Sequence, residues 1–321
     1  MPRAASYDED DEPIEGYRLV DFLGKGQFGE VWKAIITASG KEVALKFIDL
    51  SYSPAALKEL RALKLTINLR NSHLIPLNNA WLKDFKGKLV KLHDVDMAKQ
   101  KGKLKELIIE MGLGEKSLAA RLKEVNPDGT DLEEMQGLPT EELLEYMIGA
   151  AKGIDFLNQP DHKLGVGDGP IIHCDIKPDN MMIVSGEVQI ADCGVAVALT
   201  ENVRITKAAF SAAYGAPESI ANKPVPGTDQ YSLAISYYEL RTGRLPFPDQ
   251  HGIHEILAAH ATGRLNFSSH LITEHERTVL KWATSLQPKN RYPTCLQMVK
   301  QLIRRSTGWR RCRRPRFSLQ S

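Results

Sequence analysis

The stretch of residues 171–180, which reads IIHCDIKPDN, constrains this chain more than any other feature, together with a DCG tripeptide that begins at Asp192. These segments supply a carboxylate base (Asp175), a cation (Lys177) and two oxygen donors (Asn180 and Asp192). Phosphoryl transfer needs these parts, because its transition state is stabilised by a positioned hydroxyl and by cations against the phosphate oxygens. We expect Asp175 to orient the hydroxyl and accept its proton, and Lys177 to neutralise the phosphate. Asn180 and Asp192 are expected to hold Mg²⁺, which prefers oxygen ligands. Taken alone, the motif also fits a polar turn.

A glycine-rich pattern near the start of the chain supports the same chemistry. Gly24, Gly26 and Gly29 follow the GxGxxG spacing, and glycines let the backbone approach phosphates without interference from a Cβ. The same spacing opens dinucleotide-binding domains, but those need a helix directly after the glycines. Residues 31–36 and 42–48 instead read as two strands around a polar turn. The pattern therefore favours a β-hairpin over a dinucleotide-binding unit.

Lys46 lies midway along the second of these predicted strands. Strand side chains alternate, so Ala44 and Lys46 share one face. A lysine inside an apolar strand needs an anionic partner if it is buried, whereas on an edge strand it extends to solvent. Glu59 is the single acidic residue between Asp49 and Asp84, and it falls in a segment with helical apolar spacing. We predict a pair between Lys46 and Glu59.

In their order along the chain, these motifs resemble the catalytic elements of eukaryotic-like serine/threonine protein kinases, over roughly residues 17–305. The resemblance implies an α+β fold of two lobes, a β-rich N-lobe with one key helix and a mainly helical C-lobe. It also implies transfer of phosphate from ATP to serine or threonine hydroxyls of protein substrates and of the chain itself, with Mg²⁺ or Mn²⁺ as cofactor. Within it, Glu59 corresponds to the glutamate that aligns the lysine with the phosphates.

The resemblance also assigns an adenine pocket. Residues 107–112 resemble the hinge between the lobes, with Ile109 at the back of the pocket. Backbone groups of Glu110 and Gly112 would contact the base, with Met111 between them. Apolar walls, as in most ligand pockets, are assigned to four residues: Leu23, Val31, Ala44 and Met182.

A third group of residues concerns the substrate. Residues 216–218 read APE, which resembles the end of the activation segment, and Asp229 matches the aspartate of a central helix in the family. Arg291 matches the arginine that pairs with the APE glutamate, Glu218, so both are expected to be structural. Small-molecule kinases of related fold lack this region. Lys177 and Ser211, at the position of the substrate-loop threonine, favour serine or threonine over tyrosine as the acceptor.

Two cysteines depart from the family pattern. Cys174 replaces the arginine that in most members binds a phosphate on the activation segment. We therefore hypothesise activity without phosphorylation of Thr200 or Thr206. Cys193 replaces the phenylalanine of DFG with a smaller group, which gives a looser core, an easier change between active and inactive forms, or redox sensitivity. These departures keep open the alternative of a pseudokinase that serves as a nucleotide-responsive binding or scaffolding module.

Composition sets outer bounds. With 321 residues, 26% charged and 42% hydrophobic, the chain has the length for two lobes. Its four cysteines form no disulfide framework, no apolar stretch suits a membrane span, and the acidic N-terminus is unlike a signal peptide, so we expect a reducing cytoplasm. Expected boundaries are an acidic extension (1–16), N-lobe and hinge (17–112), C-lobe (113–303) and a basic tail (304–321).

The charged segments are expected at the surface. We expect the acidic extension and the basic tail, with its seven arginines, to be mobile, and the tail is a candidate for contact with an anionic partner. There is no strong nucleic-acid signal. Residues 83–105 carry eight lysines and read as a solvated loop between strands, with docking of acidic substrates as the alternative.

Overall fold

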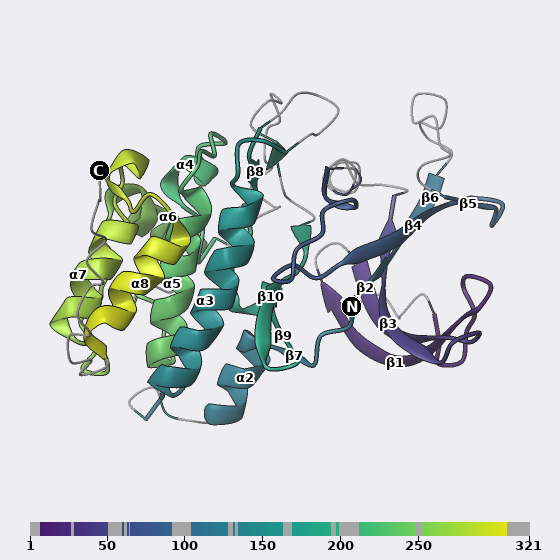
Figure 1. Cartoon of the computed structure of the whole chain (residues 1–321), viewed down its shortest axis with the longest axis horizontal. Helices are drawn as coiled ribbons and strands as arrows, with labels where there is room; N and C mark the ends of the chain where they lie inside the picture. The colour runs from purple at the N-terminus through teal and green to yellow at the C-terminus, as the bar shows by residue number, and fades with distance from the viewer. Residues whose placement is uncertain are drawn as a thin grey trace, which may run out of the picture.

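A β-rich lobe and a helical lobe lie side by side in the computed structural model (Figure 1), which confirms the expected α+β architecture. The structure describes residues 7–26, 29–50, 60, 63, 65–91, 104–127, 131, 134–162, 169–193, 197–198, 212–247 and 252–306.

The N-lobe is built on a six-stranded antiparallel sheet with the order β1-β2-β3-β6-β4-β5. The predicted hairpin is present, with Val31 opposite Lys46 across its two strands. Six consecutive residues of the second strand of that hairpin are buried, because side chains cover both faces of the sheet. The strands are β1 (Tyr17–Gly26), β2 (Gly29–Ile36), β3 (Lys41–Asp49), β4 (Leu77–Asp84), β5 (Leu89–Lys91) and β6 (Leu104–Met111).

Residues 7–16 pack against the N-lobe sheet, so the expectation of a mobile acidic extension is wrong for this part. The Tyr7 ring lies 4.5 Å from that of Phe47, and its hydroxyl donates to Glu106 at 2.6 Å. Ile14 is buried in the same cluster. The acidic run is held because the apolar side chains on its two sides pack in this cluster, Ile14 buried and Tyr7 partly so.

The lysine-rich segment is partly a strand. β5 pairs with β4 around a turn in which Asp84 accepts the backbone N–H groups of Lys86 and Lys88, at 2.8 and 2.9 Å. The expectation of a loop without strands is therefore wrong at residues 89–91, because one aspartate closes a turn that the lysine count did not reveal. Residues 92–103 lie outside the described part of the chain.

The C-lobe is helical around an apolar core to which α3, the longest helix described, contributes seven buried side chains. The sequence predicts that a helix opens at residues 140–142, with a capping hydroxyl from Thr140 and two early acidic residues. The acidic residues Glu141 and Glu142 do lie in the first turn, but the predicted cap is wrong, because Pro139 occupies the N-cap position and no side chain caps the helix. The helices are α2 (Leu118–Val125), α3 (Thr140–Leu157), α4 (Pro217–Ile220), α5 (Thr228–Thr242), α6 (Ile253–Thr262), α7 (Glu274–Ala283) and α8 (Cys295–Ser306).

Two small sheets flank residues 173–180, which we call the catalytic segment, at the junction of the lobes. One has the order β10-β9-β7, and the other joins β8 to β11. The strands are β7 (Lys116–Ser117), β8 (Ile171–Ile172), β9 (Met181–Val184), β10 (Glu187–Ile190) and β11 (Val197–Ala198). Among the described residues, no helix combines the length and apolar character that a bilayer span requires.

Candidate active site

Lys46 on β3 meets Asp192, which follows β10, across the junction of the lobes. The Lys46 Nζ lies 2.8 Å from Asp192 Oδ1, and the lysine side chain is 8% exposed. Asp192 has a positive φ of 56°, which side chains other than glycine seldom adopt and which is common at functional sites. The structure thus brings together two of the residues expected to contact phosphates and metal. Glu59, the other predicted partner of Lys46, lies outside the described residues.

Two further predicted residues, Lys177 and Asn180, lie around the carboxylate of a third, Asp175. Asp175 is buried, and its Oδ2 accepts from Lys177 Nζ at 2.9 Å and from Asn180 Nδ2 at 3.0 Å. The Asn180 amide nitrogen also donates to the Asp175 carbonyl at 2.8 Å. Because the Nδ2 of Asn180 serves both bonds, its Oδ1 is the atom available to a cation.

Asp229, at the start of α5, binds the backbone of this segment through its carboxylate. Its Oδ1 accepts the N–H of Cys174 at 2.9 Å, and its Oδ2 accepts the N–H of His173 at 2.8 Å. Asn158, directly after α3, donates to the same Oδ2 at 3.1 Å and to the carbonyl of Ile171 at 3.1 Å. These bonds fix a backbone that includes the positive φ of Cys174, 65°. Sequence reasoning missed Asn158, for which the one signal was a polar residue ending an apolar helix.

The two variant cysteines differ in environment. Cys174 is 4% exposed, and burial raises the pKa of its thiol well above the usual value, so this thiol stays protonated. That condition disfavours redox chemistry at Cys174. Cys193 is partly buried and packs against the C-lobe core. Cys174, Cys193 and Cys295 are free thiols.

The glycine loop contains two glycines with nearly the same backbone but different surroundings. Gly24 has φ 155° and Gly29 has φ 154°, values at which a residue with a side chain would have a strained backbone. A Cβ on Gly24 would meet nothing within 4 Å, whereas one on Gly29 would lie 1.7 Å from the carbonyl oxygen of Phe47. The third glycine of the motif therefore also permits close packing of β2 on β3.

This difference predicts unequal costs for alanine. Gly24→Ala should lower the free energy of unfolding by roughly 1 kcal/mol through backbone strain, and Gly29→Ala by a further ~1–3 kcal/mol through overpacking. Urea denaturation of both variants measures the difference. Equal losses would show that the contact with Phe47 carries no weight.

The hinge is anchored by a side chain and by its backbone. Glu110 is 3% exposed, and its carboxylate accepts from Tyr17 Oη at 2.8 Å and Asn79 Nδ2 at 2.6 Å. The Gly112 N–H donates to the Pro76 carbonyl at 2.9 Å, so the predicted base contact through the Gly112 backbone would use its carbonyl. Gly112 packs so closely on Pro76 that a Cβ would lie 2.9 Å from its ring.

The residues expected to line the adenine pocket lie on adjoining strands. Ala44 on β3 is paired with Met111, and Lys46 is paired with Ile109, in the ladder between β3 and β6. Ala44 and Ile109 are buried, Val31 and Met182 partly so, and Leu23 at the edge of the glycine loop is 49% exposed.

A buried ion pair attaches α4 to the rest of the C-lobe. Arg291 donates to both Glu218 oxygens, at 2.5 and 2.9 Å, and its side chain has no exposed surface. Thr228 adds a bond to the same carboxylate at 2.9 Å. Closer to the catalytic segment, Tyr214 donates its hydroxyl to Glu239 of α5 at 2.7 Å. Ser211 lies outside the described residues.

Glu239 predicts a pH dependence of stability. Burial, opposed by the Tyr214 hydroxyl and assisted by the charge of Asp179, raises its pKa from 4.5 to about 7. Between these values the folded state holds a proton that the unfolded state has lost, so this group's contribution to stability falls as pH rises. Glu239→Gln should therefore gain stability over the wild type by up to about 3 kcal/mol between pH 4.5 and 8. Urea denaturation at several pH values tests this, and parallel curves would contradict it.

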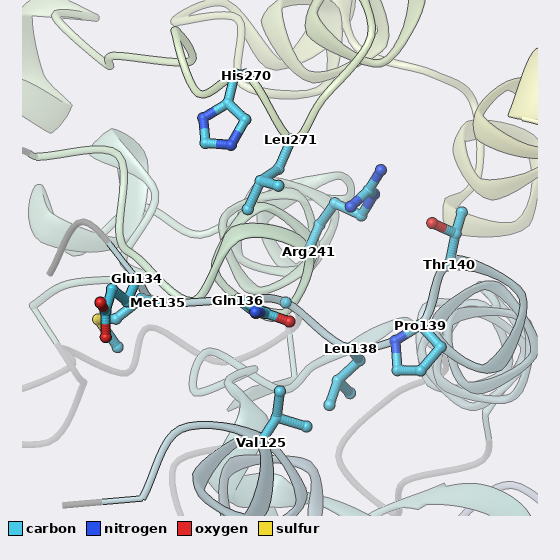
Figure 2. Close-up of a pocket in the computed structure, with 11 residues that line it drawn as sticks. Val125, Glu134, Met135, Gln136, Leu138, Pro139, Thr140, Arg241, His270 and Leu271 are labelled. Atoms are coloured by element: carbon cyan, nitrogen blue, oxygen red, sulfur yellow. The ribbon is translucent and has the colours of Figure 1, made fainter. Parts of the chain in front are cut away.

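A hollow of about 780 Å³ lies at the N-terminal end of α3 and is separate from the predicted site residues. Figure 2 shows His270 and Leu271 on one side of it and Val125 and Leu138 on the opposite side. An 18-residue helix is about 27 Å long, so Thr140 at the rim lies far from the catalytic segment, which begins after the other end of α3. This hollow contains none of the predicted site residues.

Known proteins with similar sequences identify the family of this chain. The chain matches the family model described as protein kinase domain over residues 17–311, and it belongs to that family. It is similar to a probable serine/threonine-protein kinase of Dictyostelium discoideum, with 29% identity over 72% of this chain and 38% of that protein. The sucrose non-fermenting protein kinase 1 of Fusarium virguliforme is 28% identical over 75% of this chain and 30% of its own length. Serine/threonine-protein kinase PknB of Mycobacterium leprae is 26% identical over 91% of this chain and 43% of its own. The chain thus spans less than half of these relatives.

Proposed function

We propose that this chain is an active serine/threonine protein kinase that transfers phosphate from ATP to hydroxyl groups of protein substrates and of itself. The observation that carries the proposal is the contact between Lys46 and Asp192, 2.8 Å apart, together with the cluster of Asp175, Lys177 and Asn180. The two groups adjoin, because Ala191, the residue before Asp192, donates its N–H to the Asn180 carbonyl at 2.9 Å. The names of the relatives support the serine/threonine class.

The residues present fit a magnesium nucleotide. Asn180 and Asp192 offer amide and carboxylate oxygens, the donors that Mg²⁺ or Mn²⁺ takes, and Lys46 supplies a fixed positive charge beside them. The backbone of Gly24 and Gly29 can adopt its positive φ because no side chain is present. When bound, the metal ion supplies positive charge to the phosphate oxygens.

In this mechanism the chain's own side chains orient the phosphates and the substrate hydroxyl, and one of them accepts the proton of that hydroxyl. Lys46 holds the phosphates, and Asp175 orients the substrate hydroxyl and accepts its proton. The hydroxyl oxygen bonds to the γ-phosphorus as the bond from that phosphorus to the bridging oxygen breaks, and ADP leaves. Lys177, bonded to Asp175, balances the charge on the transferred group. Asp229 contributes by fixing the backbone on which Asp175 stands. Ala44, Ile109 and the hinge are assigned to the adenine.

The proposal extends to the domain boundaries and the cellular environment of the chain. We assign residues 17–112 to the N-lobe and hinge and 113–303 to the C-lobe, with a basic tail for an anionic partner. The three free thiols in the described residues support a reducing, cytoplasmic environment. Independence from Thr200 and Thr206 phosphorylation also belongs to the proposal, and both residues lie outside the described part.

Phosphoamino-acid analysis tests the acceptor class. The purified chain, incubated with labelled MgATP and a histone mixture, is expected to place label on serine and threonine. Label on tyrosine alone would contradict the serine/threonine assignment. Binding of ATP without any transfer, under conditions in which the chain is folded, would favour the pseudokinase.

A further inference from the structure

His260 is a buried polar residue of α6 to which none of the roles above has been given. Its imidazole has no exposed surface and bridges two parts of the C-lobe. Nδ1 lies 2.7 Å from the hydroxyl of Tyr231 on α5, and Nε2 lies 3.2 Å from the carbonyl oxygen of Ala213. The Phe247 and Tyr231 rings lie 5.0 and 5.5 Å away. In such surroundings both ring nitrogens need a partner, and both have one.

The partners of His260 determine which of its nitrogens carries the proton. A carbonyl oxygen only accepts, so Nε2 donates to Ala213, and Nδ1 accepts from the Tyr231 hydroxyl. Burial, opposed by backbone contacts with Ala213 and Ala212, lowers the pKa of His260 to about 4. The ring is therefore neutral at ordinary pH and acts as a fixed donor.

Through Tyr231, His260 connects to the buried ion pair described above. The guanidinium of Arg291 lies over the Tyr231 ring, 5.0 Å from its centroid, and the same guanidinium binds Glu218. Ala213 and Glu218 are the two ends of a six-residue stretch. Both ends are thus attached to one network of side chains.

We propose that His260 is a positioning residue for the protein substrate: its Nε2–H holds the Ala213 carbonyl, and with it the segment 212–216 that precedes α4. The inference rests on the proposed function, because this segment directly follows Ser211, which the kinase resemblance places at the position of the substrate-loop threonine. Tyr231 acts through His260 by holding Nδ1 in the acceptor form. Within the described part of the chain, the contacts of His260 are with Tyr231, Ala213 and Phe247, so we expect the effect on the protein substrate.

Four variants separate positioning from simple core packing. His260→Leu removes the donor, His260→Gln retains an N–H group, and Tyr231→Phe removes the hydroxyl while keeping the ring over which Arg291 lies. His254→Leu, an exposed histidine of the same helix, is the matched control. Hydrogen–deuterium exchange of residues 212–216 and the KM values for a histone mixture and for ATP are measured on each folded protein.

In His260→Leu, exchange at 212–216 and the KM for histone should each rise about tenfold, with the KM for ATP unchanged, because the partly buried Ala213 carbonyl loses its donor. Tyr231→Phe should give a smaller rise, His260→Gln should recover at least half of the effect, and His254→Leu should match the wild type. Unchanged exchange and KM in folded His260→Leu, or a uniform rise in exchange throughout the C-lobe, would overturn the proposal. Should the wild type transfer no phosphate, the proposed function fails, while local exchange still decides whether His260 holds this segment.

Discussion

Asp175→Asn is expected to lower kcat for phosphate transfer about 10³-fold, while the KM for ATP stays near the wild-type value. Asparagine retains the size of aspartate and an oxygen that can accept from Lys177 and Asn180, which now bond to Asp175 at 2.9 and 3.0 Å. It cannot accept the proton of the substrate hydroxyl. Steady-state kinetics with a histone mixture measures both constants.

Asp179→Asn is the matched control for this prediction. Asp179 lies in the same segment but is exposed, so its replacement should change kcat by less than about threefold. A similar loss of kcat in both variants would show that the segment responds to any loss of negative charge. A kcat within tenfold of wild type in Asp175→Asn would remove the proton-accepting role.

Glu218→Gln is expected to lower the free energy of unfolding by about 3–5 kcal/mol, the second large effect. The Arg291 side chain has no exposed surface, and its charge would lose the carboxylate that it contacts at 2.5 and 2.9 Å. Its bonds to the carbonyls of Gly227 and Ser285 would remain, so the native geometry is kept while the charge is left uncompensated.

An exposed ion pair provides the comparison for Glu218. Arg18 and Asp10 are 2.9 Å apart, with side chains 46% and 73% exposed, so Asp10→Asn should cost less than about 1 kcal/mol. The double variant of Glu218→Gln with Arg291→Met should lose less than the sum of the single losses, since neither charge remains. Urea denaturation measures the wild type, the three single variants and the double variant. An equal cost for Glu218→Gln and Asp10→Asn would refute the buried-pair argument.

The sequence was most informative where local pattern and chemistry agree. Alternating and apolar residues predicted the hairpin of β2 and β3, because strand periodicity is a property of a short segment. The positions of Lys46, Asp175 and Asp192 could be connected because each lies in a motif with a resemblance to a known catalytic element. Their spacing along the chain says nothing of the 2.8 Å contact itself, which depends on packing of the two lobes.

What the sequence did not reveal depends on single contacts between distant segments. His260 meets Ala213 and Tyr231 only through the packing of α6 on α5, and an isolated histidine carries no pattern that predicts this. The N-terminal residues were misjudged because charge dominates their composition, whereas burial of Tyr7 and Ile14 decides their position. Likewise, the resemblance assigned the Gly112 backbone to the base, but only the fold shows that the Gly112 N–H donates to the Pro76 carbonyl.

The claim on which the other assignments depend is that Lys46 and Asp192 hold MgATP in a catalytically productive form. It is tested most directly by transfer of labelled phosphate from ATP, comparing the wild type with Lys46→Met at equal concentrations of folded protein. We predict label on the chain itself and on a histone mixture with the wild type, and a loss of at least about 10²-fold with Lys46→Met. Equal labelling by the two proteins, or none by the wild type, would contradict the account.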